Sequence, residues 1–234
     1  MNLCYTDKKQ RGKGMELNRY IDHTLLKADA TRDQILNLCA EAKKYHFASV
    51  CVNSSWVSLC ATELTDSDVK VCTVVGFPLG AMSSEAKAFE CAQAVKDGAD
   101  EIDMVMNIGE LKAGNEDAVV HDIQSVVQAA KGRCVKVILE NCLLSKAQIV
   151  RACELCVEAG ADFVKTSTGF SSAGAKLEDV KLMKESVRGA CKVKAAGGVR
   201  THGDLLAMIK AGADRIGTSA GIALLADEPN ESDY

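Results

Sequence analysis

The chain has 234 residues, of which 47% are hydrophobic and 26% charged, a composition typical of a globular protein with one sizeable core. The net charge of −4 argues against a nucleic-acid or anionic-membrane partner. No apolar run reaches the ~18–20 residues that a membrane-spanning helix needs, so we expect no membrane contact.

The first residues, MNLCYTDKKQRGKGM, are polar and basic and lack the apolar core of a secretory signal. A basic, acid-poor start also suits a transit peptide, but the usual serines and amphipathic pattern are missing. We predict a mobile extension over residues 1–15, one folded domain over 16–225 and a flexible acidic tail over 226–234.

Short, continuous apolar runs recur along the chain and indicate strands that are covered on both faces. In chain order they are 20–24, 49–52, 69–76, 101–106, 135–141, 163–168, 193–198 and 215–219, the first being the least distinct. Helical spacing of apolar residues lies between them, at 31–45, 83–97, 116–131, 145–159, 176–189 and 202–211, and less clearly at 54–65. Thr31 and either Ser83 or Ser84 are suitable N-cap residues.

The triplet Gly-Ala-Asp occurs at 98–100, 160–162 and 212–214, each time between a predicted helix and a predicted strand. Glycine readily takes the left-handed conformation that ends a helix. Regular alternation with short turns predicts parallel strands, and eight strands without a long interruption favour a closed barrel over an open sheet. No G-x-G-x-x-G motif follows an early strand. The predicted fold is therefore α/β, a single-domain (β/α)8 TIM barrel.

The 11 cysteines are odd in number and lie mostly in apolar segments. This pattern indicates buried, reduced thiols and a cytoplasmic protein rather than a disulfide framework. One C-x-x-C pair, Cys153 and Cys156, lies in a helical pattern without a second pair or a nearby histidine. It gives little support to a zinc or redox site.

Two lysines occupy similar places in consecutive predicted strands, Lys165 in FVKTST and Lys194 in VKVKAAGGV. A lysine in an apolar strand is costly to bury as a cation unless its amine reaches water. Neighbouring strands lie ~4.8 Å apart, so two inward ammonium groups would repel and favour one neutral, nucleophilic amine. We predict that Lys165 attacks a carbonyl and that Lys194 supplies the repulsion. Lys192 shares the face of Lys194 but lies further from the C-terminal end of the strand.

Asp103 lies among apolar residues in EIDMVM and needs partners if it is buried. It either forms a structural ion pair, or pairs with a lysine at the barrel mouth and relays protons. Glu101 is the less central candidate on the same side of the strand. Glu140 and Asn141 end the strand 135–141 and are candidates to orient the lysines.

Small residues lie at the ends of the last two predicted strands, in Gly197-Gly198-Val199-Arg200 and in Gly217-Thr218-Ser219-Ala220-Gly221. A third such segment, Thr168-Gly169, closely follows Lys165. In TIM barrels the loops after strands seven and eight commonly bind phosphate through backbone N–H groups and a helix N-terminus. These loops predict a phosphorylated substrate.

The chain resembles the deoxyribose-phosphate aldolase family. The matching stretches are YIDHTLLK (20–27), VVGFPLG (74–80), GADEIDMVMNIG (98–109), KVILEN (136–141), GADFVKTSTGF (160–170), VKAAGGVR (193–200) and RIGTSAG (215–221). The resemblance implies a cofactor-free, metal-free class I aldolase, a carbon–carbon lyase of deoxyribose phosphate catabolism. Such an enzyme cleaves 2-deoxy-D-ribose 5-phosphate reversibly to D-glyceraldehyde 3-phosphate and acetaldehyde through a lysine Schiff base. It also implies a cytoplasmic homo-oligomer, either a dimer or a tetramer.

The family pattern assigns roles to individual positions. Lys165 would form the Schiff base, Lys194 would assist proton transfer and Asp103 would relay protons, with no metal ligand. The sugar side would be lined by Asp22, Thr24 and Cys51. The phosphate would be held by Gly169, Gly197, Gly198, Arg200, Gly217 and Ser219.

Two positions depart from the pattern of some members. Phe170 stands where these members have a lysine, which leaves more of the phosphate binding to Arg200 and backbone amides. Tyr234 ends a short, acidic tail, so we leave this residue out of the predicted site. The alternatives are another phosphate-binding barrel, such as a transaldolase or a sugar-phosphate isomerase, and a non-catalytic barrel that serves as a binding module.

Overall fold

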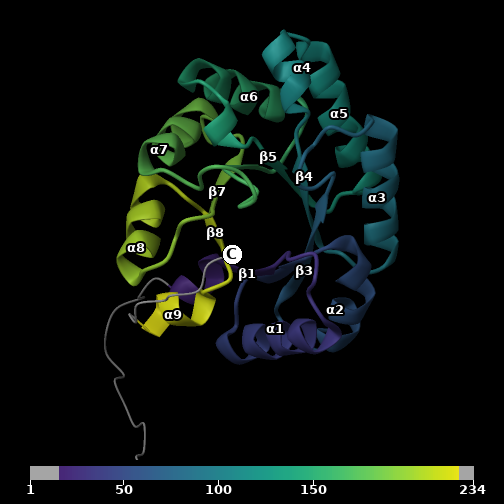
Figure 1. Cartoon of the computed structure of the whole chain (residues 1–234), viewed down its shortest axis with the longest axis vertical. Coiled ribbons are helices and arrows are strands. Elements are labelled where there is room, and N and C mark those ends of the chain that lie inside the picture. Colours follow the sequence, from purple (N-terminus) through teal and green to yellow (C-terminus); the bar gives the residue numbers. More distant parts are fainter. Residues whose placement is uncertain (1–15, 227–234) are drawn as a thin grey trace, which may run out of the picture.

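The computed structural model describes residues 16–226, which form a closed parallel barrel of eight strands, each paired with its neighbours in chain order. Figure 1 looks along the barrel and shows the helices as a ring outside the strands. The strands are β1 Ile21–Leu25, β2 Ser49–Val52, β3 Lys70–Val75, β4 Glu101–Val105, β5 Cys134–Ile138, β6 Phe163–Lys165, β7 Lys192–Ala196 and β8 Arg215–Thr218. All eight predicted strands and the predicted TIM barrel are confirmed. The predictions for residues 1–15 and for the tail from 227 to Tyr234 lie outside the described residues.

The helices between the strands follow the predicted segments. They are α1 Arg32–Tyr45, α2 Val57–Glu63, α3 Ser84–Lys96, α4 Ile108–Ala113, α5 Glu116–Ala129, α6 Lys146–Glu158, α7 Leu177–Ser186, α8 His202–Ala211 and α9 Gly221–Ala226, with short 3-10 turns η1 Leu17–Tyr20, η2 Ser54–Trp56 and η3 Asn141–Leu143. Helices α4 and α9 were not predicted. Each has only six residues, which is too short for a helical period to show in the sequence.

Side-chain caps fix where the longer helices begin. The Thr31 hydroxyl accepts a hydrogen bond from the backbone N–H of Gln34, and the Gln34 side chain accepts one from the backbone N–H of Thr31. Ser83 caps α3, which settles the choice between Ser83 and Ser84. Such a cap stabilises a helix by about 1 kcal/mol, because it satisfies N–H groups that have no partner within the helix.

The Gly-Ala-Asp triplets connect neighbouring strands at the N-terminal end of the barrel. Their glycines have positive φ, as predicted for helix ends: 107° at Gly98, 82° at Gly160 and 113° at Gly212. The aspartates have a role that the sequence did not indicate. Each accepts a hydrogen bond from a backbone N–H near the start of the preceding strand: Asp100 from Val71 (3.0 Å), Asp162 from Val135 (2.8 Å) and Asp214 from Val193 (2.8 Å). The triplet therefore both ends a helix and ties two neighbouring strands together.

The two faces of the strands bury different chemistry. Outward side chains such as Val50 and Val164 pack against the helices in one apolar core. Several inward side chains are instead charged and fully buried, among them Asp22, Asp103 and Lys194. Because residues alternate between the two faces of a strand, an apolar shell encloses a buried cluster of charged side chains in the barrel interior. We call this cluster, which includes Asp22, Asp103 and Lys194, the chamber.

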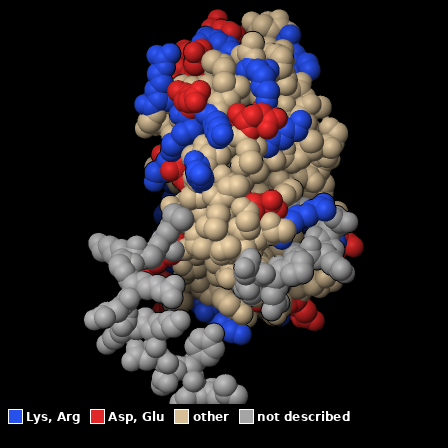
Figure 2. Space-filling model, turned by 90° about the vertical axis from the view of Figure 1, so that its left-hand side faces the viewer, with Lys and Arg blue, Asp and Glu red and all other residues tan. Residues whose placement is uncertain are grey.

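No helix in residues 16–226 is long and apolar enough to cross a membrane. On the face shown in Figure 2, lysines and arginines are interspersed with aspartates and glutamates. The part of this face that the grey residues leave visible therefore carries both signs of charge.

Candidate active site

Asp103 is the centre of the chamber. Its side chain is completely buried on β4, and its Oδ2 atom lies 2.8 Å from the Lys165 amine and 2.7 Å from the Lys194 amine. Lys165 and Lys194 are direct neighbours in the pairing of β6 with β7. The three residues predicted to be catalytic are thus brought together, and the two lysines share one carboxylate oxygen.

Buried charges hold the protonation states of this cluster. Burial raises the pKa of Asp103, but the neighbouring cations, Lys136 first, outweigh it and hold that pKa well below its usual range. Burial lowers the pKa of Lys194, but Asp103 and Asp22 outweigh it and raise that pKa above its ordinary value. Asp103 is therefore a carboxylate and Lys194 a lasting cation beside Lys165.

Lys192, the alternative to Lys194, does not belong to the cluster. It lies at the start of β7, is exposed, and holds its amine 5.6 Å from the centre of the Phe163 ring. The preference for the lysine nearer the C-terminal end of the strand therefore agrees with the geometry.

Sequence reasoning missed two cations in the chamber, Lys136 on β5 and Arg215 on β8. The Lys136 amine lies 2.8 Å from Asp103 Oδ1 and 2.7 Å from Glu101 Oε2. Arg215 pairs with both Asp22 and Glu101. Lys136 carried the same signal that identified Lys165, a lysine within an apolar strand. Nothing in the sequence indicated that its register partner on the adjacent strand β4 is Asp103.

The residues predicted for the sugar side divide between two places. Asp22 belongs to the chamber, because its Oδ2 lies 2.6 Å from the Lys194 amine and its Oδ1 accepts a hydrogen bond from Ser49 at 2.7 Å. Burial raises the pKa of Asp22, but Arg215 and Lys194 outweigh it and lower that pKa below its usual range. Cys51 is also buried there, in a small apolar cluster with Leu26, Cys72 and Val74, with Phe77 packed against it.

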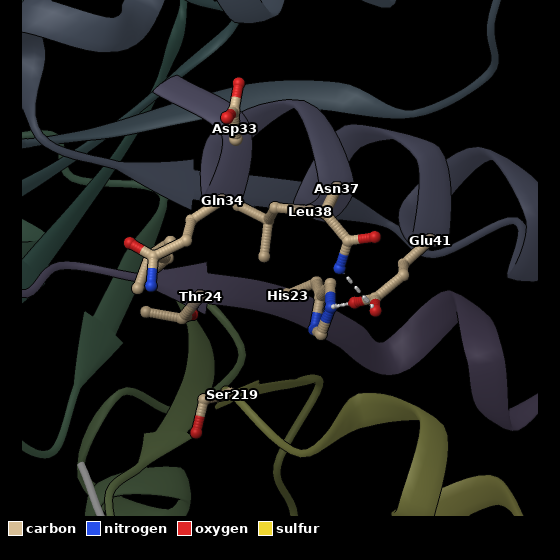
Figure 3. Close-up of a pocket in the computed structure, with 9 residues that line it drawn as sticks. His23, Thr24, Asp33, Gln34, Asn37, Leu38, Glu41 and Ser219 are labelled. Carbon is tan, nitrogen blue, oxygen red and sulfur yellow. Dashed lines mark hydrogen bonds and ion pairs between the residues drawn. The ribbon is translucent and has the colours of Figure 1, made fainter. Parts of the chain in front are cut away.

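Thr24 and Ser219 line a separate pocket of about 460 Å³ between α1 and the strand end of β1 (Figure 3). On the same pocket wall, His23 Nε2 lies 2.7 Å from a carboxylate oxygen of Glu41. None of the clustered lysines lines this pocket. The predicted contacts of Thr24 and Ser219 with substrate stay predictions.

The predicted phosphate loops lie at the C-terminal ends of β6, β7 and β8. Gly169, Gly197 and Gly198 all have positive φ, and a Cβ added to Gly197 would lie 3.8 Å from the Gly169 Cα, so two of the loops adjoin. Gly217 also lies close to the Lys194 side chain. A Cβ there would lie 3.1 Å from the Lys194 side chain, so glycine leaves room for that lysine.

Phe170, which replaces the lysine of some family members, packs edge-on against Phe77 with the ring centres 5.2 Å apart. Phe77 follows β3 and Phe170 follows β6, so this contact joins loops from strands that are not neighbours. Glu140, a candidate to orient the lysines, has partners in the loop after β6. It accepts hydrogen bonds from the backbone N–H and the hydroxyl of Thr168, and thereby holds the loop after β6.

The ligand atoms of Cys51, Cys72 and Asp103 lie within 4.8 Å of one another, a spacing that a metal ion requires. However, lysine amines contact both Asp103 oxygens, and burial holds the pKa of Cys72 well above its ordinary value. A divalent cation here would meet ammonium groups and a protonated thiol, so the donor set fits a metal poorly. In the C-x-x-C pair, burial raises the pKa of Cys153 to about 12, which also disfavours zinc.

Comparison with known proteins agrees with the geometry. Residues 17–227 match the model of the DeoC/LacD family aldolases. The deoxyribose-phosphate aldolase of Streptococcus uberis is 58% identical over 220 residues, which cover 94% of this chain and 100% of that protein. Among solved structures, the aldolase QR15 superposes with a TM-score of 0.87 at 40% identity, covering 91% of this chain and 96% of that one. The deoxyribose phosphate aldolase of Aeropyrum pernix superposes with a TM-score of 0.84 at 34% identity, covering 90% and 89%.

The match spans nearly the whole barrel, and it includes the strands that bear the clustered lysines and Asp103. The chain therefore belongs to the DeoC/LacD aldolase family.

Proposed function

We propose that this aldolase cleaves 2-deoxy-D-ribose 5-phosphate to D-glyceraldehyde 3-phosphate and acetaldehyde, reversibly, through a Schiff base on Lys165. The observation that carries the proposal is the shared contact of Lys165 and Lys194 with one oxygen of Asp103. The names of the relatives from Streptococcus uberis and Aeropyrum pernix support the choice of substrate.

The chemistry follows from the three groups. The neutral Lys165 amine attacks the C1 aldehyde of the open-chain sugar, and the carbinolamine loses water to form a protonated imine. Asp103, or a water that it orders, accepts the proton of the C3 hydroxyl, and the C2–C3 bond breaks. Its electrons flow into the imine and give an enamine, which is protonated at C2 and then hydrolysed to acetaldehyde and free Lys165. The Lys194 ammonium, which lies 2.7 Å from Asp103 Oδ2, donates protons in these steps.

A substrate panel tests the proposal. We expect release of acetaldehyde from deoxyribose 5-phosphate, undiminished after treatment with a chelator because no step needs a metal. Turnover of ketose phosphates but not of deoxyribose 5-phosphate would favour a transaldolase or a sugar-phosphate isomerase instead. A strict metal requirement would contradict the Schiff-base mechanism.

Arg200, which follows the two glycines after β7, is expected to bind the substrate phosphate together with backbone N–H groups. We predict that Arg200→Ala raises KM for deoxyribose 5-phosphate about 10- to 100-fold, the loss of about 1.5–3 kcal/mol for hydrogen bonds to a charged group. The control is unphosphorylated deoxyribose, whose kcat/KM should change little. An equal loss on both substrates would contradict a phosphate contact.

We also propose that the protein works in the cytoplasm as a homo-oligomer, either a dimer or a tetramer. The ten cysteines in the described residues are all free thiols, which suits a reducing compartment, and the Aeropyrum pernix relative is tetrameric. Light scattering after size exclusion should give a mass of two or four chains. A monomer at micromolar concentration would reject the assembly.

A further inference from the structure

Lys136 is a buried lysine of the chamber that the catalytic steps above leave without a role. Its side chain is completely buried on β5. Its amine lies 2.8 Å from Asp103 Oδ1, 2.7 Å from Glu101 Oε2 and 3.4 Å from the Cys72 sulfur. A fully buried ammonium group is stable only with partners of this kind, so Lys136 and the two carboxylates depend on one another.

The two oxygens of Asp103 are divided between different partners. Lys136 and the Cys72 thiol bind Oδ1, whereas Lys165 and Lys194 bind Oδ2. A carboxylate held on both oxygens cannot rotate freely about its terminal torsion. Lys136 therefore fixes the orientation in which Oδ2 faces the two lysines.

The charges of the buried network sum to zero in only one protonation state of Lys165. The titratable groups of the buried network to which Lys165 belongs are Asp22, Cys51, Cys72, Glu101, Asp103, Lys136, Lys194 and Arg215. Lys136, Lys194 and Arg215 are cations, and each is matched by one of the carboxylates of Asp22, Glu101 and Asp103. The buried network is thus electrically neutral when Lys165 is a neutral amine. Without Lys136, it would be neutral only with Lys165 protonated.

We propose that Lys136 is a positioning residue for catalysis: it orients Asp103 and supplies the positive charge that leaves Lys165 as a neutral, nucleophilic amine. This inference rests on the proposed Schiff-base function of Lys165. It assigns to Lys136, rather than to Lys194 alone, a share of the electrostatic activation, because both cations are needed for the balance.

The test compares Lys136→Met with Lys87→Met. Lys87 is a matched control, because it is also completely buried and its amine lies 2.6 Å from the buried carboxylate of Asp122, outside the chamber. Both variants break a buried ion pair, so both should lose stability. Only Lys136→Met should move the acid limb of the kcat/KM profile, by about one to three pH units toward higher pH, the usual effect of one nearby charge. Equal shifts in the two variants, or none in Lys136→Met, would overturn the inference.

Glu101 supplies a test of the opposite sign. Glu101→Gln leaves an unmatched positive charge, so the acid limb of the variant's kcat/KM profile should move toward lower pH. This variant tests the charge balance even if Lys136→Met fails to fold. The double variant Lys136→Met/Glu101→Gln removes one charge of each sign and should return the acid limb to within about half a unit of the wild type. An acid limb that Glu101→Gln leaves unmoved or raises would contradict the charge balance.

The wild type separates this inference from the proposed function. A wild-type protein that borohydride cannot trap with acetaldehyde refutes the proposed function, and the role of Lys136 falls with it. If the wild type is trapped but neither Lys136→Met nor Glu101→Gln moves the acid limb of the kcat/KM profile, only the role of Lys136 is refuted.

Discussion

Replacing Lys165 by methionine is expected to abolish aldolase turnover while leaving the barrel folded. Methionine is similar in length but has no amine, so the Schiff base cannot form. The loss of an obligatory nucleophile lowers kcat by at least about 10⁴-fold. Lys136 and Lys194 remain in contact with Asp103, so the carboxylate keeps its partners. Acetaldehyde release measures turnover, and circular dichroism checks the fold.

The same variant decides where the covalent bond forms. Borohydride with acetaldehyde should add one ethyl group to Lys165 of the wild type, also in the presence of a chelator, and none to the variant. Lys192→Met is the control, because Lys192 is exposed on the neighbouring strand and should retain trapping and turnover. An ethyl group mapped to Lys194 or Lys136 would move the nucleophile to that residue.

Asp103→Asn is expected to lower kcat by about 10²- to 10⁴-fold, the usual contribution of a general acid or base. Asparagine keeps the shape of the side chain but cannot accept the proton of the C3 hydroxyl. The amines of Lys136, Lys165 and Lys194 also lose their shared carboxylate. A variant with unchanged kcat on deoxyribose 5-phosphate would remove Asp103 from the proton relay.

The loss of stability in Asp103→Asn should depend on pH with a definite sign. Surrounding lysines hold the pKa of Asp103 well below its usual range, whereas an unfolded aspartate titrates near ~3.9. The carboxylate therefore stabilises the fold fully above about pH 4, and this contribution is lost as the pH falls through the folded-state pKa. Urea unfolding at neutral and at acidic pH should show the difference between wild type and variant shrinking in acid. A difference independent of pH would contradict the charged state of Asp103.

Much of the fold could be predicted because its signals are local. Apolar runs, helical spacing and N-cap residues such as Thr31 each depend on a few neighbouring residues, and the Gly-Ala-Asp triplets mark the turns where strands begin. Helices α4 and α9 were missed because each is only six residues long.

The sequence by itself determined the class of barrel and the family. It also showed that Lys165 and Lys194 occupy similar places in consecutive strands. The apolar neighbours of Asp103 in EIDMVM also indicated that this carboxylate needs partners if it is buried. The barrel and the lysine pair need only the period of a strand and the order of the segments, whereas the family rests on the resemblance of motifs such as GADFVKTSTGF.

Only the tertiary structure decided which charges touch. Lys136 and Asp103 are neighbours because β4 and β5 pair in one register, and Arg215 reaches Asp22 across 193 positions of sequence. A register is set by closure of the whole barrel, in which every strand must satisfy its two neighbours at once. Periodicity assigns a residue to a face but not to a partner, which is why the sequence could name Lys165 and Asp103 but not the cation that lies between Asp103 and Glu101.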